Sequence, residues 1–204
     1  MTAPTYDTLT TDDTGADKIL TTGTVTALDQ NPVSIAQRGT GAPRVQVPVR
    51  EYKTSGTAAT WTIPSGVTAF TIYVIGGGGG TGGTPADSTV TYNSITYTGS
   101  AGSNATTDTG GAGGSASGGD LNLTGQRGSP GVSNSGESGS GGIAAMFGGY
   151  SYGNGSTGAG ADGGGGAGGC CVKRIDVVVG QTSATYTVGA GGTGAGGGLI
   201  VFEY

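Results

Sequence analysis

Few residues of this chain could do chemistry, and their types and spacing exclude most catalytic sites. The 204-residue sequence contains no histidine, which excludes a Ser-His-Asp triad, a Cys-His pair and an imidazole metal site. The two cysteines, Cys170 and Cys171, are adjacent, and a bond between neighbours closes only a small strained ring. We therefore expect two reduced, packed thiols, with a vicinal or intermolecular disulfide as the alternative. No catalytic residue, metal site or cofactor is predicted.

One stretch matches a nucleotide-binding motif but lacks the context that the motif needs. Residues 189–194 read Gly-Ala-Gly-Gly-Thr-Gly, which fits G-x-G-x-x-G. A dinucleotide site also needs a following helix and an acidic residue about 20 positions further on. Here more glycine and alanine lead directly into an apolar stretch, so we reject a nucleotide site. With eight Lys and Arg and a net charge of −5, we also expect no nucleic-acid partner.

Glycine dominates the centre of the chain. There are 48 glycines, several times the share of about 7% in average proteins, and they concentrate in residues 76–169. Their spacing does not keep the strict period of three that a collagen triple helix requires. Two interpretations remain: a flexible Gly/Ser linker, or packed glycine helices of the polyproline-II type, in which only glycine permits close approach of neighbours. Strand-like sequence on both sides favours the packed arrangement.

The elements that would hold this centre in place are β-strands. In the stretch before the glycines, Phe70, Ile72 and Val74 alternate with polar residues, which predicts one buried face. Turns are expected at 64–66 and at Gly180-Gln181, the second as a tight hairpin. The strand pattern predicts an all-β fold in which paired strands hold the packed glycine layers. The expected strands cover 60–63, 67–75, 173–179, 184–188 and 199–204.

The N-terminal residues differ in composition and form a separate segment, 1–51, in front of a domain over 52–204. Asn31 is a good N-cap, Pro32 suits a first helical position and Gly39 suits a stop, so a short helix is expected. So short a helix is not stable alone, and we expect the segment to dock on something else or on its own copies. The first residues lack the basic and apolar regions of a secretory signal, so none is predicted.

The order of motifs resembles a known family, the glycine-rich domain at the ends of many bacteriophage tail fibres and virion proteins. The resemblance covers about residues 52–204, and a weaker likeness to N-terminal segments of phage structural proteins covers 27–45. It implies a β-sandwich with glycine-helix layers. The chain departs from the family by an expected extra hairpin at 90–104 and by Cys170–Arg174. The motifs are TWTIPSGVTAFTIYVIGGGGGTGG (60–83), GGDLNLTGQRGSPG (118–131), AAMFGGY (144–150), DGGGGAGG (162–169) and TYTVGAGGTGAGGGLIVFEY (185–204).

The resemblance implies a function on the virion. The first hypothesis is an adhesin, located on a tail fibre or other surface fibre, that binds a host surface glycan or an outer-membrane protein. Residues 1–51 would attach it to other virion structural proteins, and a homotrimer is expected by analogy with phage fibres. The second hypothesis is a structural decoration or fibre component without receptor binding. A free ice-binding or wall protein would need a regular Gly-x-x repeat, which is missing. Aromatic and amide side chains on rigid loops suit receptor contact, and the candidates are Tyr92, Asn93, Tyr97, Tyr150, Tyr152 and Asn154.

Overall fold

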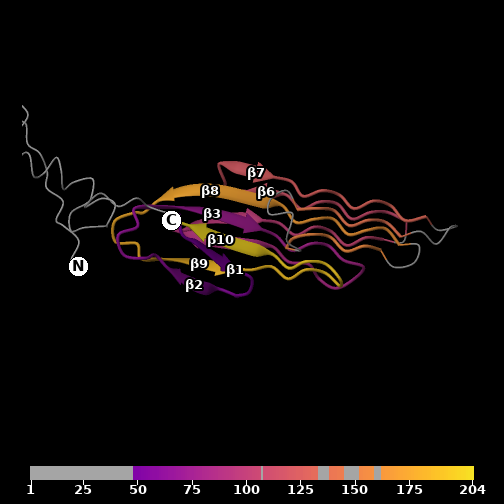
Figure 1. The fold of residues 1–204 in the computed structure, drawn as a ribbon, viewed down its shortest axis with the longest axis horizontal. Coiled ribbons are helices and arrows are strands. Elements are labelled where there is room, and N and C mark those ends of the chain that lie inside the picture. Colours follow the sequence, from indigo (N-terminus) through magenta and orange to yellow (C-terminus); the bar gives the residue numbers. More distant parts are fainter. Residues whose placement is uncertain (1–47, 107, 133–137, 145–151, 159–161) are drawn as a thin grey trace, which may run out of the picture. The chain divides into compact units, whose positions relative to one another are not determined.

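The computed structural model describes residues 48–106, 108–132, 138–144, 152–158 and 162–204 (Figure 1). The chain divides into two compact units, Met1–Val47 and Pro48–Tyr204, and everything described below belongs to the second. The helix predicted at 31–39 lies outside the described residues. No helix long and apolar enough to cross a membrane occurs in the described part of the chain.

The described unit is all-β, with two antiparallel five-stranded sheets and no helix among its described residues. One sheet has the order β1-β10-β3-β8-β7 and the other the order β2-β9-β4-β5-β6. Both contribute to one apolar core, consistent with the β-sandwich that was predicted. The strands are β1 (Arg50–Lys53), β2 (Ala59–Thr62), β3 (Ala69–Ile75), β4 (Ser88–Tyr92), β5 (Ile95–Gly99), β6 (Ala116–Ser117), β7 (Leu121–Leu123), β8 (Cys170–Asp176), β9 (Ser183–Thr187) and β10 (Leu199–Glu203).

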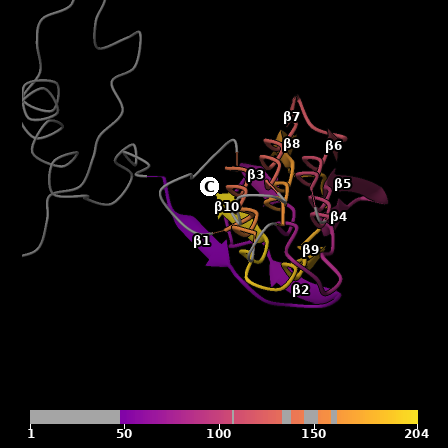
Figure 2. The ribbon, with the colours of Figure 1, turned by 90° about the vertical axis from the view of Figure 1, so that its right-hand side faces the viewer.

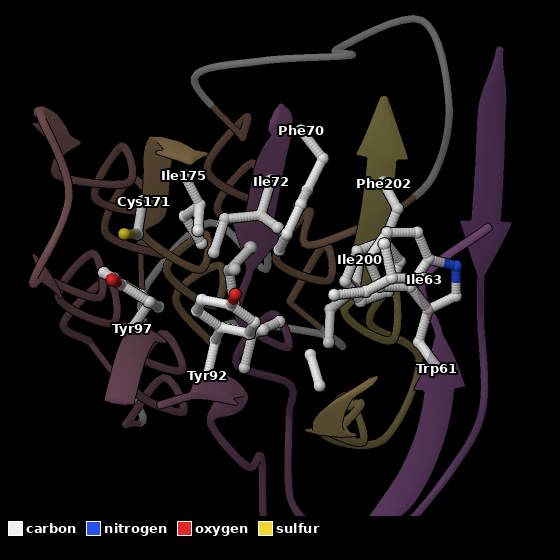
Figure 3. Packing of buried hydrophobic residues seen from close by; sticks show 13 residues of the cluster. Trp61, Ile63, Phe70, Ile72, Tyr92, Tyr97, Cys171, Ile175, Ile200 and Phe202 are labelled. Carbon is white, nitrogen blue, oxygen red and sulfur yellow. The ribbon is translucent and has the colours of Figure 1, made fainter. Parts of the chain in front are cut away.

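The core between the sheets is built on stacked aromatic rings (Figure 3). Trp61 of β2 stacks on Phe202 of β10, with ring centroids 4.1 Å apart and an interplanar angle of 11°. Phe70 meets the same indole edge-on at 4.9 Å, a preferred aromatic geometry. Ile72 and Val74 lie on the same buried face of β3. The alternation predicted for this strand is confirmed.

The tight hairpin predicted at Gly180-Gln181 is wrong, because β8 and β9 belong to different sheets. Residues 177–182 instead cross from one sheet to the other, and β8 ends at Asp176 rather than at 179. A two-residue hairpin would have put both strands in one sheet. Here each strand turns its apolar side toward the same core from opposite sides.

The extra hairpin expected after residue 90 is confirmed as β4 and β5. Its two turn residues, Asn93 and Ser94, have φ angles of 47° and 63°. Positive φ at both central positions is the requirement of a type I′ turn, which matches the twist of the strands it joins.

The glycine-rich segments run out from one end of the sheets and lie side by side (Figure 1). Seen end-on, they project as small coils laid next to one another (Figure 2). Segment 162–169 lies in the middle and hydrogen-bonds to neighbours on all sides through its backbone. These neighbours are 76–80, 100–106, 109–115, 124–130, 139–144 and 153–158.

The hydrogen bonds of segment 162–169 repeat every third residue. Gly163, Gly166 and Gly169 donate to carbonyl oxygens of one neighbour, segment 100–106. The residues at the other two positions of the period donate to segments 124–130 and 153–158. Its carbonyl oxygens accept in the same period from segments 76–80, 109–115 and 139–144. Buried backbone groups need such partners, and this pattern supplies them without a sheet.

Glycine is required where a segment faces a neighbour. A Cβ added at Gly166 would collide with the carbonyl group of Ala112, and residues 163–169 are all buried. Segment 124–130 lies nearer the surface and keeps glycine at the buried positions Gly125 and Gly128. Its remaining residues from 126 to 130 are exposed and carry side chains. Of these two segments, the central one is thus almost entirely glycine, and the one nearer the surface keeps glycine only at its buried positions.

Candidate binding surface

The turns at the far ends of the glycine segments form the candidate binding surface, which we call the distal loops. Each joins a segment that leaves the sheets to one that returns, and they lie at the end of the segments away from the strands (Figure 1). Loops on a rigid scaffold are where binding residues concentrate in proteins generally. The described distal loops comprise 81–84, 106 with 108–109, 129–132 with 138–140, 157–158 with 162, and 193–195.

Two of the distal loops are fastened to each other. Thr193 donates its amide to the carbonyl of Gly82 at 2.7 Å. The side chain of Asn104 holds the first loop from the other side, because its Oδ1 accepts from the amide of Gly80 and its Nδ2 donates to the carbonyl of Gly83, each at 2.8 Å. This corner of the surface is therefore fixed by hydrogen bonds rather than by apolar packing.

The other distal loops are also held by backbone hydrogen bonds, some within a turn and some between loops. Thr106 and Thr109 exchange amide-to-carbonyl hydrogen bonds of 3.0 and 3.2 Å across their turn. Gly139 donates to the carbonyl of Asp162 at 3.0 Å and accepts from the amide of Gly158 at 2.9 Å. Loops that are distant in the sequence therefore meet at the far end of the packed glycine segments.

The described distal loops present small polar side chains. No aromatic side chain occurs among their described residues, and Val132 is the one large aliphatic side chain exposed there, at 47%. No group of three or more metal-ligating side chains is found in the described residues. The surface can therefore form hydrogen bonds with its hydroxyl and carboxylate groups. The exposed polar side chains are Thr81, Thr84, Thr106, Asp108, Thr109, Ser129, Ser138, Ser140, Thr157 and Thr193.

The expectation that Tyr92 and Tyr97 are exposed loop tips is wrong. They are 4% and 5% exposed, respectively, and belong to the core (Figure 3). The hydroxyl oxygen of Tyr92 accepts a hydrogen bond from the amide of Val178 at 2.7 Å, and burial raises the pKa of Tyr97. Strand alternation could have revealed this, since Val90 lies two residues before Tyr92 on the same buried face.

The remaining candidates do not gather at one place either. Asn93 is exposed in the turn between β4 and β5, at the end of the sheets opposite the glycine segments. Tyr152 is partly buried against the second apolar cluster, and the side chain oxygen of Asn154 accepts from the amide of Ala144 at 2.8 Å. Tyr150 lies outside the described residues. Tyr152 and Asn154 therefore contribute to the scaffold.

The adjacent cysteines are free, buried thiols. Successive residues of a strand point to opposite faces, so Cys171 packs in the core between the sheets and Cys170 in the cluster on the other face of β8. Burial raises the pKa of Cys170 to about 12. Since the thiolate is the reactive form, neither thiol is placed for chemistry with an external substrate.

Comparison of the chain with models of known families finds no match, and comparisons with curated proteins and with solved structures find no significant similarity.

Proposed function

We propose that the glycine segments form a bundle of polyglycine-II helices that the sheets hold together at one end. A helix of this type has three residues per turn and no internal hydrogen bonds. Its backbone groups must bond to neighbours, and contacts with one neighbour recur every third residue. The donors Gly163, Gly166 and Gly169, which all bond to one neighbouring segment, support this proposal. Each bond contributes about 0.5–1.5 kcal/mol, so the bundle depends on many bonds forming together.

We propose further that the chain is a bacteriophage fibre or tail-tip protein that binds a receptor on the host surface through its distal loops. The observation that carries the proposal is the meeting of several sequence-distant loops at one end of the bundle, where their described residues present exposed polar side chains. Such loops can change in sequence without disturbing the segments that carry them. Their hydroxyl and carboxylate groups suit hydrogen bonding to a surface glycan or to an outer-membrane protein.

The proposal also covers how the protein attaches to the virion and how many copies assemble. Residues 1–51 connect the protein to other structural proteins of the virion, and the assembled form is a homotrimer. The resemblance to phage fibre proteins supports both statements by analogy. Light scattering of the purified full chain tests the second: a mass three times that of the chain is expected, and a stable monomer would contradict it.

The test of receptor binding compares host cells with receptor-deficient mutants, using the purified full chain as probe. Thr109→Arg and Thr157→Arg place a bulky side chain on two distal loops, where both threonines are exposed. Ser115→Arg is the matched control, because Ser115 is also exposed but lies where segment 109–115 returns to the sheets. A hot spot contributes about 2 kcal/mol or more, near 30-fold in affinity. We expect this loss of affinity for host cells in Thr109→Arg and Thr157→Arg but not in Ser115→Arg. Equal binding by the three variants would contradict the proposal.

One observation favours the alternative, a structural virion component without receptor binding. The described distal loops carry no aromatic side chain, whereas binding hot spots are enriched in tryptophan, tyrosine and arginine. The alternative predicts that particles lacking the protein adsorb to host cells at the wild-type rate. The adhesin proposal predicts a lower rate, so adsorption of such particles separates the two.

A further inference from the structure

The sheet with the order β1-β10-β3-β8-β7, which we call the first sheet, is held at both of its edges by carboxylate groups. Its outermost strands are β1 and β7 (Figure 2), which have four and three residues and contain no buried residue. An edge strand is paired on one side only. These two strands therefore depend on few contacts beyond their backbone pairing.

Two carboxylates join β1 to β10, one on each face of the sheet. On the core side, Glu51 accepts a hydrogen bond from the hydroxyl of Tyr204 at 3.0 Å and another from Nζ of Lys53 at 2.8 Å. On the outer side, Arg50 of β1 forms an ion pair with Glu203 of β10. Tyr204 directly follows β10, so both contacts bind the edge strand to its neighbour.

One carboxylate joins β7 to β8. Asp120 directly precedes β7, and its amide donates to the carbonyl of Val172 at 2.9 Å. Its carboxylate accepts from Nζ of Lys173 at 2.6 Å and from the amide of Arg174 at 3.1 Å. Both of these residues belong to β8. Protonation of Asp120 would remove the ion pair that holds this edge.

The other sheet, with the order β2-β9-β4-β5-β6, is built differently. Its five strands contain no charged residue. Its edge strand β2 is anchored instead by Trp61, which is 2% exposed and stacks on Phe202. Acid therefore has ion pairs to break at the edges of the first sheet and none within the strands of the other.

The groups around Glu51 favour its charged form. Partial burial raises the pKa of this carboxyl group, but the neighbouring Lys53, Tyr204 and Trp61 side chains outweigh that effect, and the pKa lies below its usual value. Lys53 carries a positive charge, and Trp61 on β2 carries none. The stabilisation by Glu51 is therefore complete above the usual value of about 4.3 and is lost as the pH falls through the lowered pKa.

The groups around Asp120 act in the same direction. The hydrogen bond from Lys173 is the main cause that lowers the pKa of Asp120, and the amide of Arg174 adds to it. Tyr97 and Cys171 also face this carboxylate from the core side, and burial raises the pKa of both. Those two groups stay uncharged in acid, so the loss of stabilisation at low pH comes from Asp120 itself.

We infer that the first sheet opens at its edges in acid: protonation of Glu51, Glu203 and Asp120 releases β1 and β7 while the rest of the sandwich stays folded. Exposed ion pairs contribute little individually, but opening a short edge strand costs far less than unfolding the whole unit. The central strands β3, β8 and β10 are held by buried core residues, which acid does not change. This inference does not depend on the proposed function.

The test is residue-resolved hydrogen exchange of the purified full chain at neutral pH and at about pH 3, with protection corrected for the intrinsic exchange rate at each pH. Protection of the β1 amides should fall about fivefold in acid relative to that of the β2 amides. Protection of the β7 amides should fall in the same direction.

Variants assign the effect to the named groups. Glu51→Gln/Glu203→Gln should lower the protection of β1 at neutral pH to its acid level and leave β7 unchanged, and Asp120→Asn should do the reverse, so each variant controls for the other. Asp176→Asn alters an exposed carboxylate at the end of β8 and should leave both edges as in the wild type.

Three results would overturn the inference. Unchanged protection of β1 and β7 in acid would show that the edges do not open. An equal loss of protection in β2 and β3 would show that acid unfolds the whole unit. A loss in acid that persists unchanged in the edge variants would show that other groups are responsible.

Discussion

Gly165→Ala is the substitution that most sharply separates a packed bundle from a flexible linker. The added Cβ would meet the carbonyl group of Gly79 far inside contact distance and would lie 3.0 Å from the amide nitrogen of Gly80, whereas carbon atoms prefer about 3.5–4.0 Å. Segments 76–80 and 162–169 would have to separate.

The cost follows from the hydrogen bonds that such a separation disturbs. The amide of Gly165 donates to Ser156 at 2.9 Å, its carbonyl accepts from Gly142 at 2.9 Å, and the carbonyl of Gly79 accepts from Ser156 at 2.9 Å. Each bond contributes about 0.5–1.5 kcal/mol, and overpacking adds about 1–3 kcal/mol. Alanine also lowers the conformational entropy of the unfolded chain, and this effect raises the free energy of unfolding by about 0.4–1 kcal/mol. The free energy of unfolding should therefore fall by about 2–7 kcal/mol.

Thermal unfolding followed by the fluorescence of Trp61, the single tryptophan, measures this effect. At about 2–4 °C per kcal/mol for a unit of this size, Tm should fall by about 4–28 °C. Gly82→Ala is the control, because its Cβ would meet nothing nearer than the hydroxyl of Thr193 at 3.8 Å, and it should melt within about 2 °C of the wild type. Equal Tm values for both variants would refute close packing of the segments.

Three further predictions concern buried side chains. Tyr92→Phe leaves the amide of Val178 without its partner, so the free energy of unfolding should fall by about 1–3 kcal/mol while binding to host cells stays unchanged; lost binding at unchanged Tm would contradict a core role. Cys170 and Cys171 should not react with a thiol reagent in the folded protein and should yield two equivalents in denaturant, whereas none in denaturant would indicate a disulfide. The pKa of Cys170 is raised to about 12, so its thiol stays protonated in the folded protein while the unfolded chain ionises near 8.5. The contribution of the protonated Cys170 thiol to stability is therefore complete below about pH 8.5 and is lost as pH rises toward 12. The free energy of unfolding should decline less steeply over this pH range in Cys170→Ala than in the wild type.

The sequence allowed the strands to be predicted because their signal is local. In β3 the alternation of Phe70, Ile72 and Val74 with half-buried residues marks the face that enters the core. The apolar run of β10 and the turn residues before β3 gave comparable signals. The pairing of the strands, the short strands β1, β6 and β7, and the true start of β8 at Cys170 came only from the structure.

The topology and the candidate site depend on contacts between distant residues. Gly180 follows a strand and precedes another, which is also the sequence of a hairpin, and only the pairing of β8 with β3 and β7 decides against it. Tyr92 and Tyr97 lie beside a turn and were expected to be exposed, but the opposite sheet covers them. The distal loops carry no motif, because their common position is created by the bundle.

The most direct test of the bundle is backbone amide hydrogen exchange, resolved by residue, over segment 162–169. Exchange protection reports the free energy of local opening. If the amides of Gly163–Gly169 bond to neighbouring segments, they should be protected to a degree comparable with those of β3 and β8. Exchange at the rate of an unstructured glycine chain would show that the segment is a linker and would contradict the packed bundle.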